Sequence, residues 1–243
     1  MIEELKNKRR PALRSSSRRG TIGWFVARIV AVFLFLSVAQ VVIYKFVPVP
    51  ITLTMLMDDH PVTKEWTALS DIDRDMVAAV ISGEDGKFCQ HNGFDQEAMM
   101  QAFKRNQKGG RIRGGSTISQ QTAKNVFLWQ GGGYLRKGLE AWYTVLIETI
   151  WGKRRIMEVY LNVAETGIGT YGVGAGAQRY YGKSARKLSA VEAARIAAVL
   201  PLPKQREVKG ADGFTRRHGN AIARRVGVVK NGALDACVYD GKR

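Results

Sequence analysis

The sequence is poor in the residues that build disulfide scaffolds and structural zinc sites. Only 2 cysteines, Cys89 and Cys237, and 3 histidines occur among its 243 residues. Two cysteines are too few for a disulfide scaffold, and apart from Cys89 and His91 these side chains stand far apart in the chain, which argues against a structural zinc site. The 6 prolines, 26 glycines and 45% hydrophobic residues are ordinary proportions, so collagen-like repeats and wholesale disorder are excluded. The length suits one main domain with an appendage.

Negative charge is scarce as well. Asp and Glu number 21 against 38 Lys and Arg, which gives a net charge of +17. The basic stretch over residues 1–20 contributes +5 of this charge, so +12 belongs to the rest of the chain. An excess of this size predicts a polyanionic partner, which could be nucleic acid, anionic lipid or a phosphorylated substrate.

One long apolar run stands near the N-terminus. It extends from Trp24 to Tyr44 and contains a single charge, Arg28. About 20 apolar residues suffice to cross a bilayer, and cations upstream of the run predict a cytoplasmic N-terminus. We therefore predict a basic cytoplasmic tail, a transmembrane anchor and an exported periplasmic domain, over residues 1–22, 23–46 and 47–243 respectively.

Two other interpretations of this run stay open. Ser37-Val38-Ala39 resembles the cleavage site of a signal peptide. The run continues through Ile43, past that site, which favours an uncleaved anchor. A buried helix of a soluble protein is the third interpretation, but such a helix would not need the basic block before it.

The exported region has the periodicity of a helical domain. Apolar residues recur at helical spacing from Leu139 to Ile150 and again from Ile156 to Leu161. Ser189 and Glu192 form a capping box before an alanine-rich run that Pro201 closes. Alternating strand patterns are nearly absent. We predict a mainly α-helical domain whose glycine-rich connections carry function.

Glu84 and Asp85 are the first candidate site residues. They follow a predicted helix that begins near Asp71. The negative end of a helix dipole disfavours carboxylates and raises their pKa, which suits a general base. The alternative is that both side chains are solvated loop residues.

A basic, glycine-rich stretch from Lys108 to Thr117 is the second candidate. Thr117 and Gln120 can box the start of the helix that follows. Such a loop before a helix N-terminus is a plausible phosphate cradle, although the P-loop spacing is missing. A merely flexible basic loop is the alternative.

Further charges stand at helix edges. Glu140 lies beside the apolar face, where it could face a cleft or simply pair with Arg136 one turn earlier. Three cations beginning at Lys153 open the next helix, where the dipole disfavours them, which again indicates an external anion. No nucleophile elbow and no nucleic-acid-binding module is recognisable.

Together these stretches resemble glycosyltransferase family 51, the peptidoglycan transglycosylases, over residues 47–225. The matching motifs are Glu84-Asp85-x-x-Phe88-x-x-His91-x-Gly93-x-Asp95, Arg113-Gly-Gly-Ser-Thr-Ile-Ser-Gln-Gln-x-x-Lys124-Asn125, Arg136-Lys137-x-x-Glu140-x-Trp142, Lys153-x-x-Ile156-Met157-Glu158-x-Tyr160-Leu161-Asn162 and Gly172 to Tyr181. The departures from the usual residues are Ser119 for Thr, Thr122 for Leu, Met157 for Leu, Gly174 for Glu and Gly176 for Ala.

The resemblance implies a lysozyme-like fold with two helical lobes, and a function. Lipid II would be polymerised into β-1,4 glycan strands with inversion and release of undecaprenyl pyrophosphate. Glu84 would be the general base with Asp85 beside it, and Glu140 would act on the donor side, with or without Mg²⁺ or Mn²⁺ at the pyrophosphate. The implied substrate-binding residues are Arg113, Ser116, Thr117, Gln120, Gln121, Lys124, Asn125, Arg136, Lys137 and Lys153.

The resemblance also implies partners and a location. The protein would act at the bacterial inner (plasma) membrane on lipid II and the growing glycan-lipid chain, beside other cell-wall synthesis or division proteins. No organic cofactor and no nucleic acid are expected, and no second catalytic module fits in the remaining chain.

Two rival functions stay open beside this prediction. A lysozyme-like cleaving enzyme would need polymer and no lipid, and a non-catalytic anionic-lipid-binding protein would leave Glu84, Asp85 and Glu140 without a role.

Export permits oxidation of the cysteines. Because Cys89 and Cys237 are far apart in sequence, we expect two thiols rather than a disulfide.

Overall fold

The computed structural model describes residues 18–107, 115–210 and 213–239. The chain divides into two compact units, Met1–Gln40 and Val41–Arg243. Helix α1 (Arg18–Phe46) fills the described part of the first unit and ends in the second. Within the described residues, Ile22–Phe46 is the one helical stretch long and apolar enough to cross a membrane. That stretch fits the predicted anchor and, equally, a signal sequence. Most of the predicted tail over residues 1–22 lies outside the described residues.

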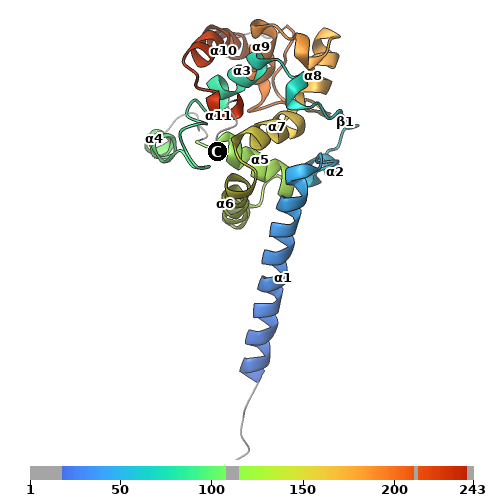
Figure 1. The fold of residues 1–243 in the computed structure, drawn as a ribbon, viewed down its shortest axis with the longest axis vertical. Coiled ribbons are helices and arrows are strands. Elements are labelled where there is room, and N and C mark those ends of the chain that lie inside the picture. The colour runs from blue at the N-terminus through green and yellow to red at the C-terminus, as the bar shows by residue number, and fades with distance from the viewer. Residues whose placement is uncertain (1–17, 108–114, 211–212, 240–243) are drawn as a thin grey trace, which may run out of the picture. The chain divides into compact units, whose positions relative to one another are not determined.

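The second unit is built almost entirely of helices, which confirms the predicted fold class (Figure 1). Its elements in chain order are α2 (Leu53–Leu56), β1 (Thr63–Lys64), α3 (Arg74–Glu84), α4 (Gln96–Gln107), α5 (Ile118–Phe127), α6 (Gly133–Ile150), α7 (Lys153–Val163), β2 (Glu165–Gly167), β3 (Thr170–Tyr171), α8 (Val173–Tyr181), α9 (Ala190–Val199), α10 (Gly213–Asn231) and α11 (Ala236–Tyr239). The periodicity of the sequence did not reveal the small sheet. In it β3 lies between β1, which it pairs in parallel, and β2, which it pairs antiparallel.

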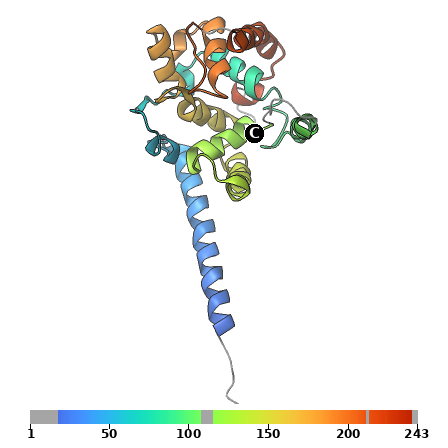
Figure 2. The same cartoon turned by 180° about the vertical axis from the view of Figure 1, so that it is seen from behind.

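Most helices of the second unit pack into two groups. Helices α3, α9 and α10 pack on one another, and α5 packs on both α6 and α7. Figure 2 shows the two groups from behind, with α7 between α5 and the α3 group. The stretch Met76–Ile81 of α3 is buried on every side, as expected of a helix enclosed by its neighbours.

Local signals set where several helices begin and end. Helix α3 begins at Arg74, slightly later than predicted, because the Asp73 side chain caps it by accepting from the backbone N–H of Asp75 at 2.8 Å. Both predicted capping boxes are present, Thr117 with Gln120 and Ser189 with Glu192. Each box satisfies otherwise unpaired N–H groups of a first helical turn.

The structure corrects the expectation of two thiols. Cys89 and Cys237 form a disulfide with their Cα atoms 5.5 Å apart. Arg74 places the C-terminal segment by binding the buried Asp235 carboxylate with Nε at 2.7 Å and Nη2 at 2.8 Å. Arg154 Nη1 also donates to the carbonyl of Val238 at 3.0 Å. Separation in sequence was a poor guide because α10 returns the chain to α3, which ends just before Cys89.

We expect the purified protein to take up no thiol label when it is alkylated under non-reducing, denaturing conditions. After reduction it should take up two labels, as read by intact mass. Because the bridge closes a long loop of the unfolded chain, its reduction should lower the free energy of unfolding by roughly 2–5 kcal/mol. Two labels without reductant would show that Cys89 and Cys237 are thiols.

Candidate active site

A cavity of about 730 Å³ lies between the two groups of helices. Its wall is formed by the end of α3, the starts of α5 and α6, the segment after α9, and α10. The lining residues are Gly83, Glu84, Ser116, Gln120, Gln121, Lys124, Arg136, Lys137, Glu140, Leu200, Pro201, Leu202, Arg206, Phe214 and His218. Side chains from the first three sequence motifs therefore meet around one space.

Glu84 is the last residue of α3, and only one of its two carboxylate oxygens accepts a hydrogen bond from the described residues. Its Oε2 accepts a hydrogen bond from Gln121 Nε2 at 2.9 Å. Its Oε1 is enclosed and has no hydrogen-bond partner among the described residues. Burial raises the pKa of Glu84, while the Gln121 hydrogen bond and the charges of Arg206 and Lys124 oppose that rise. The direction agrees with the prediction, but burial rather than the helix dipole is its main cause. A carboxylate with a vacant oxygen and a raised pKa is suited to accept a proton.

The Gln121 side-chain amide, which donates a hydrogen bond to Glu84, also accepts one. Gln121 Oε1 accepts from the hydroxyl of Tyr160 at 3.2 Å, and Tyr160 lies in the core of the domain. Because both ends of the amide are engaged, the Glu84 side chain has a defined position. Such support by a second layer of residues is what a catalytic carboxylate needs.

Lys124 stands one helical turn after Gln121 on α5. Burial lowers its pKa, and the nearby carboxylates of Glu140 and Glu84 act against that effect. The ammonium group has no hydrogen-bond partner in the parts of the chain that the structure describes. A half-buried cation that forms no hydrogen bond to the described residues, on the wall of a cavity, is a ready binding group for an anion.

Glu140 holds two cations against the same cavity. Its Oε2 accepts from Arg136 Nη1 at 2.7 Å, and its Oε1 accepts from Lys137 Nζ. Lys137 Nζ also lies 3.3 Å from Ser116 Oγ. Both sequence interpretations of Glu140 therefore describe it in part, since the carboxylate pairs with Arg136 and also lines the cleft.

The surroundings of Glu140 do not fit a divalent cation. Both of its oxygens already accept from cationic side chains. The described residues contain no group of three or more His, Cys, Asp or Glu side chains that could hold a metal. Positive charge at this wall comes instead from Arg136, Lys137 and Lys124.

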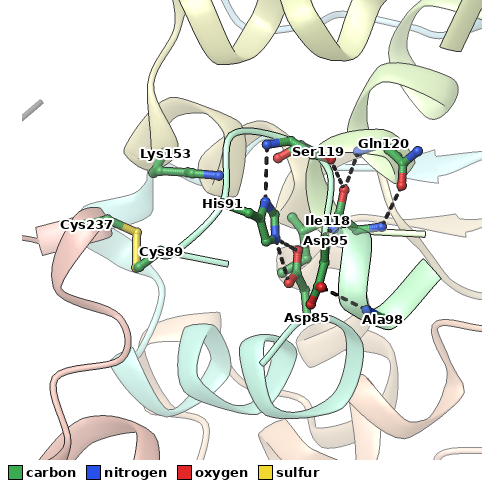
Figure 3. A network of polar contacts seen from close by, with 12 residues as sticks. Asp85, Cys89, His91, Asp95, Ala98, Ile118, Ser119, Gln120, Lys153 and Cys237 are labelled. Atoms are coloured by element: carbon green, nitrogen blue, oxygen red, sulfur yellow. Dashed lines mark hydrogen bonds and ion pairs between the residues drawn. A yellow bond between two sulfur atoms is a disulfide. The ribbon is translucent and has the colours of Figure 1, made fainter. Parts of the chain in front are cut away.

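Asp85 lies outside the cavity lining, in the polar network of Figure 3. Its carboxylate oxygens lie 2.9 and 3.0 Å from His91 Nε2, and one accepts from the backbone N–H of Ile118 at 3.0 Å. Thr117 Oγ1 donates to the carbonyl of Gly93 at 2.6 Å. Asp85 thus joins the end of α3, the following loop and the start of α5, whose dipole favours a carboxylate there.

The remaining predicted residues that the structure describes do not line this cavity. Thr117 is buried in its capping box. Asn125 lines a neighbouring space of about 430 Å³ that shares Gln121 and Lys124 with the first. Lys153 lies away from both spaces, where it donates to Glu148 Oε1 at 2.6 Å and stands 4.5 Å from the ring centroid of Phe88. Arg113 lies outside the described residues.

The cavity residues that sequence reasoning missed include Arg206, Phe214 and His218. They come from the C-terminal third of the chain and belong to none of the recognised motifs. The spacing of Phe214 and His218, one helical turn apart, was their one available signal. In the structure their rings stack, with centroids 5.6 Å apart.

Comparison with known proteins identifies a family for this chain. Residues 52–229 match the family model described as "Transglycosylase". The protein named "Biosynthetic peptidoglycan transglycosylase" from Caulobacter vibrioides is 46% identical over 228 residues, which cover 89% of this chain and 100% of that protein. Proteins of the same name from Rhodospirillum centenum and Pseudomonas aeruginosa are 43% and 47% identical. They cover 88% and 70% of this chain, and 95% and 78% of their own lengths.

Proposed function

The chain belongs to the transglycosylase family, and on that premise we propose that it is a peptidoglycan glycosyltransferase that polymerises lipid II into β-1,4-linked glycan strands. One observation carries the proposal. Glu84, with its vacant oxygen, shares a single cavity with Lys124, Arg136 and Lys137. A proton acceptor facing a group of cations is the arrangement required to join a sugar hydroxyl to a sugar pyrophosphate.

The proposed reaction is a single displacement. Glu84 takes the proton of the acceptor 4-hydroxyl, whose oxygen forms a bond to the anomeric carbon of the donor. The bond from that carbon to the pyrophosphate oxygen breaks, and undecaprenyl pyrophosphate leaves with the electron pair. Since no covalent intermediate with the protein forms, the configuration at the anomeric carbon inverts.

The leaving group explains why cations, rather than an acid, face the base. Pyrophosphate departs without protonation when its growing negative charge is stabilised by positive groups. Lys124, Arg136 and Lys137 can supply that stabilisation at the cavity wall. An ordinary glycosidic bond would instead require a proton donor for its leaving oxygen, which disfavours the lysozyme-like rival.

The proposed location follows from the substrate and the apolar helix. Lipid II carries a polyprenyl tail, so an anchored enzyme would meet it in the plane of the membrane. We place α1 across the bacterial inner (plasma) membrane with its N-terminus in the cytoplasm and the second unit in the periplasm. The growing glycan-lipid chain, and other cell-wall synthesis or division proteins, would be its partners there.

Incubation of the full-length protein with lipid II alone tests this function. We expect polymeric glycan and undecaprenyl pyrophosphate to form together. A cleaving enzyme would leave lipid II unchanged and would shorten preformed glycan. Binding of anionic lipid without any product would support the non-catalytic alternative and refute the proposal.

Lys137 provides a more specific test of the pyrophosphate site. Lys137→Met keeps the aliphatic stem and removes the charge, so we expect turnover to fall about tenfold at saturating as well as limiting lipid II. The melting temperature should be measured beside the rate. Unchanged turnover, or a loss that follows unfolding, would assign Lys137 only to its pairing with Glu140.

A further inference from the structure

Arg206 is fixed at the wall of the cavity by contacts on both sides of its guanidinium. Its Nη1 donates to the carbonyl of Ala198 in α9 at 2.8 Å. Its Cζ lies 5.2 Å from the ring centroid of Phe214 in α10. The backbone also turns tightly here, since the N–H of Arg206 donates to the carbonyl of Leu202 at 3.1 Å. A guanidinium held by a carbonyl and an aromatic face has little freedom to leave the cavity.

The charge of Arg206 reaches two titratable groups that line the same cavity. Among the charges acting on Glu84, that of Arg206 is the strongest, and it lowers the pKa of the carboxyl against the effect of burial. The same charge adds to burial in lowering the pKa of His218. Arg206 therefore favours an ionised Glu84 and a neutral His218, which is the combination that leaves Glu84 able to accept a proton.

We infer that Arg206 is a positioning residue of the reaction, which acts through Glu84 by keeping its carboxylate ionised inside a cavity that would otherwise favour the protonated acid. The inference rests on the proposed function, because it concerns the base of that reaction. It also gives the segment after α9 a part in catalysis that no recognised motif covers. Without Arg206, more of the enzyme would carry a protonated Glu84 at neutral pH.

Other charged and titratable groups surround Glu84 and must be considered with Arg206. Asp85 follows it on the chain and raises its pKa, whereas Lys124 on α5 lowers it. Helix α9 supplies no charged side chain to the described lining of the cavity. Four other titratable groups line this cavity, namely Arg136, Lys137 and Glu140 from α6 and His218 from α10. Tyr160 from α7 contacts the side-chain amide of Gln121, which binds Glu84.

The test is the pH dependence of kcat/KM for lipid II polymerisation by Arg206→Gln. We expect the acidic limb of the profile to move upward by roughly one pH unit, so that activity is lost mainly at low pH and recovers as pH rises. Arg206→Lys keeps a cation and should return the limb toward the wild-type position. Arg224→Gln, an exposed cation on α10, is the matched control and should leave the profile unchanged.

A purely structural role would give a different result. It would lower activity by the same factor at every pH, together with the melting temperature, in both Arg206 variants. The shift must also persist in a His218→Gln background, since its disappearance there would show that His218 is the group that titrates. Either outcome overturns the inference while wild-type polymerisation still supports the proposed function. Failure of the wild type to polymerise lipid II would instead refute the function.

Discussion

Glu84→Gln should lower the rate of lipid II polymerisation by about 10²–10⁴ while lipid II still binds. Gln keeps the size of the side chain and can keep a contact with Gln121, which now bonds Glu84 Oε2 at 2.9 Å. The Gln side chain cannot take up the proton of the acceptor hydroxyl, which in the wild type would go to Glu84 Oε1. The loss should therefore lie in turnover, with little change in substrate affinity.

Stability separates this result from a folding defect. Burial raises the pKa of Glu84, so folding favours the protonated carboxyl. At pH values above the ordinary Glu pKa, the ionised side chain destabilises the folded state, and this penalty grows up to the raised pKa. Glu84→Gln should therefore melt no lower than wild type at neutral pH.

A matched control uses a carboxylate of the surface. Glu97 is exposed and pairs with Lys87 at 2.5 Å, a kind of contact that contributes little. Glu97→Gln should keep normal activity. Near-normal polymerisation by Glu84→Gln would remove Glu84 from the role of base.

Lys124→Met should produce the second largest effect. A charge-assisted contact to pyrophosphate in a partly desolvated site contributes about 1.5–3 kcal/mol. Its loss corresponds to a roughly ten- to hundredfold lower kcat/KM. Lys124 should matter more than Lys137 because its ammonium group is more buried and no carboxylate bonds it directly, whereas Glu140 already neutralises Lys137.

Lys124→Met should lower activity but should not lower the stability of the folded protein. Burial lowers the pKa of Lys124, so folding favours the neutral amine. The protonated side chain therefore destabilises the folded state below the ordinary Lys pKa, and the penalty is complete below the lowered one. We expect Lys124→Met to melt at the same temperature as wild type or higher. Lys187→Met, at an exposed position, is the control for both measurements. Full activity of Lys124→Met would exclude Lys124 from the pyrophosphate site.

The positions of several helices and of the proposed base followed from local patterns. Apolar spacing predicted the helices that became α6 and α7, and capping boxes predicted the starts of α5 and α9. These signals act over one or two helical turns, so they are legible without knowledge of the fold. Glu84 was also placed correctly at the end of a helix, because that position depends on the residues next to it.

What the tertiary structure decided involves residues that are distant in the chain. Only the packing of α9 and α10 on α3 brings Arg206 and His218 to Glu84, and only the return of the C-terminal segment joins Cys237 to Cys89. The direction of Asp85, toward His91 and away from the cavity, likewise depends on where α5 begins. The sequence by itself determined the helical periodicity, the apolar run and the motif residues. The enclosure that raises the pKa of Glu84, and the charge that opposes it, arise only when separate helices exclude water from one shared space.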